Sequence, residues 1–126
     1  MSPEANKAAV RQHIAAIAEG NVAVLRDHPA FRRTQPFCHR TLAAFANGDA
    51  TVHEIVAEDN WVVARVIQRG THQGEWMGIA ATGKRVAWEV IVMFQLVDGV
   101  IVRVHCQADV LDLLYQLTAP PGPCLC

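Results

Sequence analysis

Polar side chains recur at alternate positions near the end of the chain, in a segment whose other residues are apolar. The odd positions carry Arg103, His105, Gln107 and Asp109, whereas every even position from 100 to 108 is apolar. Alternate residues of a strand lie on one face of a sheet, so these four side chains share a face. A carboxylate beside an imidazole can accept and return a proton, which makes this row a candidate acid–base site. The alternative is an ordinary face of a sheet turned toward water.

The preceding segment has one face that is apolar from end to end. The odd positions of this segment are mixed, and both faces of 60–72 are mostly apolar, which is unusual for an antiparallel sheet with one wet side. Helices can cover one face only. We therefore expect the all-apolar even face to meet a second subunit in a homodimer, and the odd face to line a cleft beneath the helices. The even positions are Val86, Trp88, Val90, Val92, Phe94 and Leu96.

Apolar periodicity predicts the elements that position these residues. A helix is expected over 3–19, with Ser2 as its N-cap and Pro3 at its first position. A helical turn over 22–26 and a second helix from Thr34 to the sequence Asn47-Gly48-Asp49 follow. A period of two then predicts strands, with Asp98-Gly99 as a tight hairpin. The strands cover 51–58, 60–72, 84–97 and 100–108, and a short helix covers 109–117.

Helices followed by a run of antiparallel strands favour a single α+β domain over 1–118, with a disordered tail rich in proline and cysteine over 119–126. The chain has 126 residues, of which 52% are hydrophobic and 18% charged, so a folded core is expected. A net charge of −1 offers no basic surface for nucleic acid. No apolar run approaches the length that spans a membrane, and no signal peptide is visible, so we expect a cytoplasmic protein.

Several kinds of catalytic site are excluded by residue type. The only serine is Ser2, next to the terminus, which argues against a serine hydrolase. The glycines make no phosphate-binding loop, and the four cysteines, Cys38, Cys106, Cys124 and Cys126, have no metal-binding spacing. The sequence therefore predicts neither a metal nor a nucleotide cofactor.

Three strings in the second half of the chain resemble the SnoaL-like polyketide cyclases, a family of the NTF2-like superfamily. They are R-G-T-H-Q-G-E-W-M-G-I-A-A-T-G-K-R-V at 69–86, D-G-V-I-V at 98–102 and D-V-L-D-L-L-Y-Q-L at 109–117. Their order and spacing match the family. The resemblance implies a cone-shaped barrel in which a curved antiparallel sheet wraps around N-terminal helices, with a short C-terminal helix.

The same resemblance implies a deep pocket, dimerisation through the outer face of the sheet, and chemistry without metal or cofactor. In the founding members an aspartate at the start of the last string is the acid/base for an intramolecular aldol ring closure, and Asp109 occupies that position. Such a carboxylate works near neutral pH when an apolar pocket raises its pKa. His105 would be its hydrogen-bond partner or a second proton carrier. Arg103 or Arg65 would stabilise an enolate.

The chain departs from the family pattern at three positions, and these departures limit which functional roles of the family can be assigned to this chain. The family usually has an acidic residue where Arg103 stands, tryptophan where His105 stands and arginine where Gln95 stands. The cluster of Arg103, His105 and Asp109 could favour an anionic substrate over a neutral hydrophobic or aromatic one. The alternatives to a bacterial cyclase of the lyase or isomerase type are a non-catalytic small-molecule-binding protein and an activity like that of ketosteroid isomerase or epoxide hydrolase.

Four further residues are candidates for substrate binding, each with a structural alternative. His72 lies at the pocket rim or in a solvated hairpin. Arg65 contacts substrate or pairs with Glu89 on the adjacent strand, because an arginine among apolar residues needs a partner. Trp76 either forms a pocket wall or fills the core, and the same two alternatives apply to Trp61. Together with Arg103 and Gln107, these residues complete the predicted binding set.

Overall fold

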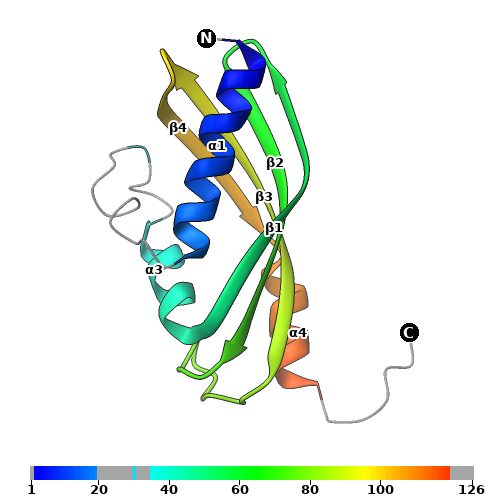
Figure 1. Ribbon diagram of the computed structural model, residues 1–126. Helices are drawn as coiled ribbons and strands as arrows, with labels where there is room; N and C mark the ends of the chain where they lie inside the picture. Colours follow the sequence, from blue (N-terminus) through cyan, green and yellow to red (C-terminus); the bar gives the residue numbers. More distant parts are fainter. Residues whose placement is uncertain (1, 20–29, 31–34, 120–126) are drawn as a thin grey trace.

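The computed structural model describes residues 2–19, 30 and 35–119, which form three helices and one sheet. The four strands are antiparallel and follow one another in the order β1-β2-β3-β4. Figure 1 shows α1 lying along one face of this strongly twisted sheet. The predicted α+β class with a curved antiparallel sheet is confirmed. The elements are α1 (Pro3–Ala18), α3 (Gln35–Ala44), β1 (Phe45–Glu58), β2 (Trp61–His72), β3 (Arg85–Val97), β4 (Val100–Ala108) and α4 (Val110–Thr118).

The first helix begins as the sequence predicts. The Ser2 hydroxyl accepts a hydrogen bond from the backbone N–H of Ala5 at 3.1 Å, and Pro3 occupies the first helical turn, where its missing N–H costs nothing. The helical turn predicted over 22–26 and most of the predicted tail lie outside the described residues.

The end of the second helix differs from the prediction. Helix α3 ends at Ala44 and β1 begins at Phe45, so Asn47-Gly48-Asp49 lies inside a strand and does not end a helix. The pairing of β1 with β2 is irregular between Ala46 and Asp49, and Asn47 has a φ of 52°. Asparagine tolerates this left-handed conformation, so the residues that suggested a helix end form a bulge.

The turn between β3 and β4 is the predicted tight hairpin. Asp98 and Gly99 have φ values of 51° and 78°, as a two-residue hairpin with two left-handed residues requires. This turn brings β4 back against β3 with Arg103 opposite Gln95 and His105 opposite Met93.

The face of the sheet that we predicted to meet a second subunit is instead the inner face, covered by α1. Val10 is fully buried and Ile14 is 8% exposed, and both pack against inner-face residues such as Val62 and Phe94. The prediction that the even face binds a partner is therefore wrong. The all-apolar row belongs to the core, because burying it beneath the helix removes the most apolar surface from water.

Helix α4 lies beside the lower end of the sheet, directly after β4 (Figure 1). Leu113 and Leu117 of this helix pack in a second apolar cluster with Phe45, Trp76 and Trp88. The Gln116 side chain continues the sheet where β4 stops: its Oε1 accepts from Ala87 N at 3.3 Å and its Nε2 donates to Ala87 O at 2.6 Å.

Candidate functional site

A cavity of about 80 Å³ lies between the end of α1, α3 and the inner face of the sheet. Most of its walls are apolar. Trp88 and Val90 come from β3, Phe45 starts β1, and Leu42 comes from α3. The remaining described lining residues are Ile17, Ala18, Thr41, Gly48, Asp49, Ala50, Gln68, Arg69, Cys106 and Ala108.

Most of the polar lining residues already have partners. Thr41 is buried and its hydroxyl accepts a hydrogen bond from Trp76 Nε1 at 3.2 Å. Asp49 and Arg69 border the cavity where β1 and β2 pair irregularly, but strand alternation turns their side chains to the outer face, where they bind each other at 2.9 Å. Gln68 is the neighbour of Arg69 on β2, and strand alternation turns its side chain to the inner face.

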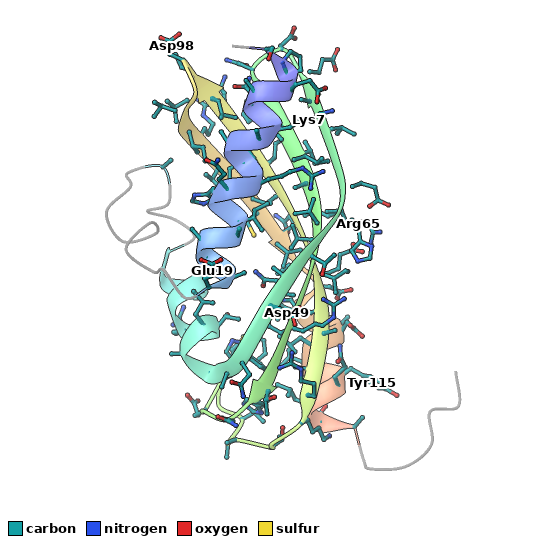
Figure 2. The ribbon with its side chains drawn as sticks, viewed as in Figure 1. Lys7, Glu19, Asp49, Arg65, Asp98 and Tyr115 are labelled. Carbon is teal, nitrogen blue, oxygen red and sulfur yellow. The ribbon has the colours of Figure 1, made fainter. Side chains whose placement is uncertain are left out.

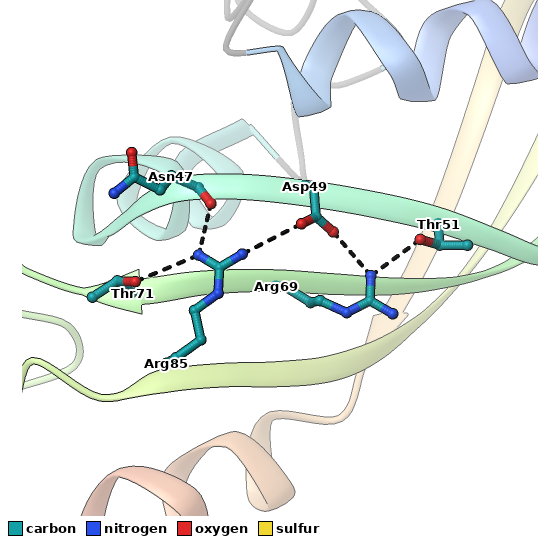
Figure 3. Close-up of polar contacts among 6 residues, drawn as sticks. All are labelled: Asn47, Asp49, Thr51, Arg69, Thr71 and Arg85. Atoms are coloured by element: carbon teal, nitrogen blue, oxygen red, sulfur yellow. Dashed lines mark hydrogen bonds and ion pairs between the residues drawn. The ribbon is translucent and has the colours of Figure 1, made fainter.

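Two arginines share the Asp49 carboxylate (Figure 3). Arg69 donates to Asp49 Oδ1 at 2.9 Å and to the Thr51 hydroxyl at 3.0 Å. Arg85 donates to Asp49 Oδ2 at 3.3 Å and to the Asn47 carbonyl at 2.7 Å. This Asp49 cluster ties β1, β2 and β3 together and leaves one positive charge unbalanced. Both oxygens of the Asp49 carboxylate therefore take part in ion pairs.

The polar row of β4 lies on the outer face of the sheet, the face turned away from α1. Arg103, His105, Gln107 and Asp109 are all exposed, and none lines the cavity. The prediction that the odd face looks into a cleft beneath the helices is therefore wrong. The physical reason is the chemistry of the row itself, because charged groups remain in water unless they are paired.

Asp109 has a clear structural role at the end of β4. Its Oδ1 accepts a hydrogen bond from the backbone N–H of Asp112 at 3.0 Å, which makes it the N-cap of α4. Its own N–H donates to the Glu89 carbonyl at 2.9 Å. An N-cap of this kind satisfies a backbone donor that the helix leaves open. The residue lies one position beyond Ala108, which lines the cavity.

Arg65 also lies on the outer face, at the centre of β2 (Figure 2). Its Nε donates to Glu54, its Nη2 donates to Glu54 at 3.1 Å, and its Nη1 donates to Glu89 at 3.0 Å. The predicted structural pairing with Glu89 is confirmed. The hydrogen bond to Glu54, followed by the one to Glu89, raises the pKa of Arg65, and the hydrogen bond from Arg65 lowers the pKa of Glu54. These three residues form the Arg65 cluster.

The other predicted binding residues lie outside the cavity. His72 is fully buried, and its ring stacks on Phe45 with ring centres 5.2 Å apart, so it is neither solvated nor at a rim. Its Nδ1 accepts from Thr82 N at 3.2 Å. Trp76 is 2% exposed within the second apolar cluster. Trp61 lies on the outer face, with its ring centre 6.2 Å from that of His105.

One cavity-lining residue that was not predicted from the sequence, Gln68, interrupts an apolar row of its strand. Gln68 is the one polar residue in the even run of β2 from Val62 to Gln68, and its cross-strand partner Trp88 is the largest side chain of the even row of β3. A single amide within an apolar row marks a change of environment along the inner face. The prediction had assigned that face to a subunit interface.

The described residues contain no group of three or more His, Cys, Asp or Glu side chains placed to hold a metal ion. Within the same part of the chain, no helix is both long enough and apolar enough to cross a membrane. The predictions of a cofactor-free site and a cytoplasmic location stay predictions.

Comparison with known proteins gives consistent results. The family model of the SnoaL-like polyketide cyclases matches residues 5–117. The chain is 33% identical to the aklanonic acid methyl ester cyclase DnrD of Streptomyces peucetius over 108 residues. The aligned region spans 82% of this chain and 74% of DnrD. Aklanonic acid methyl ester cyclase DauD of a Streptomyces strain is also 33% identical, over 82% of this chain and 67% of its own length.

Two solved structures of similar fold also come from Streptomyces species. AclR of Streptomyces galilaeus, a candidate hydroxylase, has a TM-score of 0.86 at 26% identity and covers 98% of this chain and 87% of its own. IdmH of Streptomyces antibioticus, a candidate polyketide cyclase, has a TM-score of 0.73 at 25% identity, covering 89% of this chain and 97% of its own. The two differ in their described activity, so this fold does not by itself specify the reaction.

Proposed function

The chain belongs to the SnoaL-like polyketide cyclase family, and we propose that it closes a ring in a polyketide-like substrate whose acyl end lies in the cavity. The cavity is the observation that carries this proposal. It is lined by Phe45, Leu42, Trp88 and Val90, which suit an apolar segment, and by Gln68. A bacterial source fits the Streptomyces relatives.

The size of the cavity limits which part of a substrate it accepts. A cavity of roughly 150 Å³ holds one benzene molecule, whereas this one measures about 80 Å³. It therefore suits a short acyl end, with the aromatic part of the substrate lying outside it. Holding one end of a flexible chain favours ring closure, because well-oriented intramolecular reactions gain up to roughly 7–11 kcal/mol.

The reaction requires a proton transfer at the carbon that attacks. An intramolecular aldol closure removes a proton from a carbon between two carbonyls, forms one carbon–carbon bond and protonates the new alkoxide. The product is an isomer of the substrate. We propose Asp109 as the acid/base, with His105 as a second proton carrier, on the family position of Asp109. Both side chains are exposed and neither lines the cavity, so this role requires the reacting carbon to lie outside the cavity, at the surface near the start of α4.

A matched pair of variants tests this role separately from capping. Asp109→Asn keeps an N-cap but has no carboxylate, whereas Asp109→Ala loses both and should cost about 1 kcal/mol of stability. If Asp109 is the acid/base, D109N melts like the wild type and loses ring closure. Full turnover by D109N would restrict Asp109 to its structural role.

The assay can use the substrate class of the relatives. Aklanonic acid methyl ester is incubated with the protein and followed by chromatography with mass detection. Ring closure gives a product of unchanged mass and altered retention. If no isomer forms and the compound does not raise the melting temperature, the cyclase proposal fails.

Non-catalytic binding of a small molecule is a second candidate, and one observation favours it. Among the described cavity-lining residues, Asp49 is the one carboxylate, and it is held by Arg69 and Arg85. No imidazole lies among these lining residues. A raised melting temperature with no isomer formed would select this candidate.

We also propose that the protein forms a homodimer through the outer face of the sheet. It exposes apolar side chains, with Ile91 at 43% and Val56 at 61%. The Arg65 cluster has two glutamates for one arginine, and the Asp49 cluster has two arginines for one aspartate. In a two-fold dimer the negative cluster of one copy can face the positive cluster of the other, so the face is complementary to itself.

Light scattering at high and low concentration tests the dimer. Ile91→Lys places a charge in the proposed contact and should give a monomer. Met77→Lys is the matched control, because Met77 is 61% exposed but lies in the loop beyond β2. A monomeric wild type at high concentration, or an I91K variant that remains dimeric, would contradict this interface.

A further inference from the structure

We infer that the side-chain amide of Gln68 binds an oxygen of a 1,3-dicarbonyl unit in the ligand, an inference that rests on the proposed use of the cavity. The residue lies on β2 between Ala50 of β1 and Trp88 of β3, with which it is paired in register. It is half-buried and lines the cavity. The Gln68 side chain is therefore a cross-strand neighbour of Trp88 in the wall of the cavity.

The other polar groups around the cavity have tasks within the protein. Thr41 accepts from Trp76, and Asp49 is bound by Arg69 and Arg85. Cys106 offers only a thiol, which is a weak hydrogen-bonding group. In the described part of the chain, no hydrogen bond is found for the Gln68 amide. Its donors and its acceptor remain available to whatever occupies the cavity.

An amide has the right mixture of groups for a 1,3-dicarbonyl. It offers two N–H donors and one carbonyl acceptor. A ketone or enolate oxygen accepts from the N–H, and an enol hydroxyl donates to the carbonyl. The enol form of a 1,3-dicarbonyl carries both kinds of oxygen. A hydrocarbon in the same place would cover the amide without pairing it, and an unpaired buried polar group opposes binding.

This preference makes Gln68 a residue that determines specificity. A hydrogen bond of this type contributes about 1 kcal/mol net, and 1.4 kcal/mol corresponds to a factor of ten. We therefore expect the amide to favour the dicarbonyl over a hydrocarbon of equal length by about three- to tenfold.

Benzoylacetone and butylbenzene are suitable probes, because they have the same carbon skeleton and differ in the dicarbonyl unit. Their dissociation constants are measured by NMR titration for the wild type, Gln68→Met and Gln12→Met. Methionine is close to glutamine in size, and Gln12 is an exposed glutamine on α1, outside the cavity. The side-chain amide signals of Gln68 give a second readout that needs no variant.

The inference is supported if the ratio of the affinities for benzoylacetone and butylbenzene is about three- to tenfold lower in Q68M than in the wild type and Q12M, and the Gln68 amide signals move when benzoylacetone binds. It is overturned if the ratio in Q68M stays within a factor of two of the wild-type ratio and those signals stay in place. In that case the cavity remains a binding site. If neither probe binds the wild type, the proposed use of the cavity fails and the role of Gln68 fails with it.

Discussion

The docking of α4 depends on one lysine, and removing its ammonium group should destabilise the whole domain. Lys84 Nζ donates to the carbonyls of Gln116, Leu117 and Ala119 at 3.1, 3.3 and 2.9 Å. Hydrogen bonds to a charged donor contribute about 1.5–3 kcal/mol, and a cation at a helix C-terminus adds about 0.3–1 kcal/mol. Because the three bonds share one charge and are part-buried, we expect Lys84→Met to cost about 2–3 kcal/mol in total.

Urea unfolding of K84M against the wild type measures this cost, with the free energy taken from linear extrapolation. The chain offers a matched control, because its other lysine, Lys7, makes only a 3.4 Å pair with the 82% exposed Glu4. Lys7→Met should change stability by less than about 0.5 kcal/mol. If K84M unfolds at the same urea concentration as K7M, the three carbonyl contacts do not stabilise α4.

Two further substitutions test the sheet. Gly70→Ala would place a Cβ atom 2.7 Å from the Cβ of Phe45. We therefore expect urea unfolding to show a loss of about 1–3 kcal/mol in the free energy of unfolding. An unchanged free energy of unfolding would show that β1 and β2 can move apart at this point without cost. Glu54→Gln removes a carboxylate whose pKa lies below its ordinary value of 4.5. The contribution of Glu54 is complete above pH 4.5 and is lost as the pH falls through the lower folded-state pKa. The stability difference between wild type and E54Q should be constant from pH 7 to 5 and disappear in stronger acid, and a difference that grows on acidification would refute the pairing with Arg65.

Local features of the fold could be predicted because they depend on neighbouring residues. Ser2 and Pro3 begin α1, and Asp98-Gly99 makes the hairpin, as their chemistry requires. The pairing of Arg65 with Glu89 also follows from two strands in register. The end of α3 could not be placed from the sequence, because Asn47-Gly48-Asp49 suits both a helix end and a bulge. Only the pairing with β2 decides between them.

The choice of the inner face could not be made from alternation alone. Alternation separates two rows but does not say which row a helix covers. The cost of desolvation gives the missing criterion. Burying Arg103, His105 and Asp109 would leave charges without partners, whereas burying the row of Trp88 and Phe94 leaves none. Applied to β2, the same criterion leaves Gln68 and His72 as the polar residues inside, and of these two Gln68 lines the cavity and is the residue to which we assign ligand recognition.

The position of α4 means that activity lost on substitution of Asp109 has two possible causes. Asp109 caps the start of this helix and Lys84 binds its end. The helix in turn packs against Phe45 and Trp88, which are walls of the cavity. A carboxylate can therefore affect ring closure by holding α4 in place without touching substrate. The two causes give different patterns. If activity falls in D109A and K84M but not in D109N, Asp109 acts by positioning the cavity wall. If it falls in D109N and not in K84M, the carboxylate itself takes part in proton transfer.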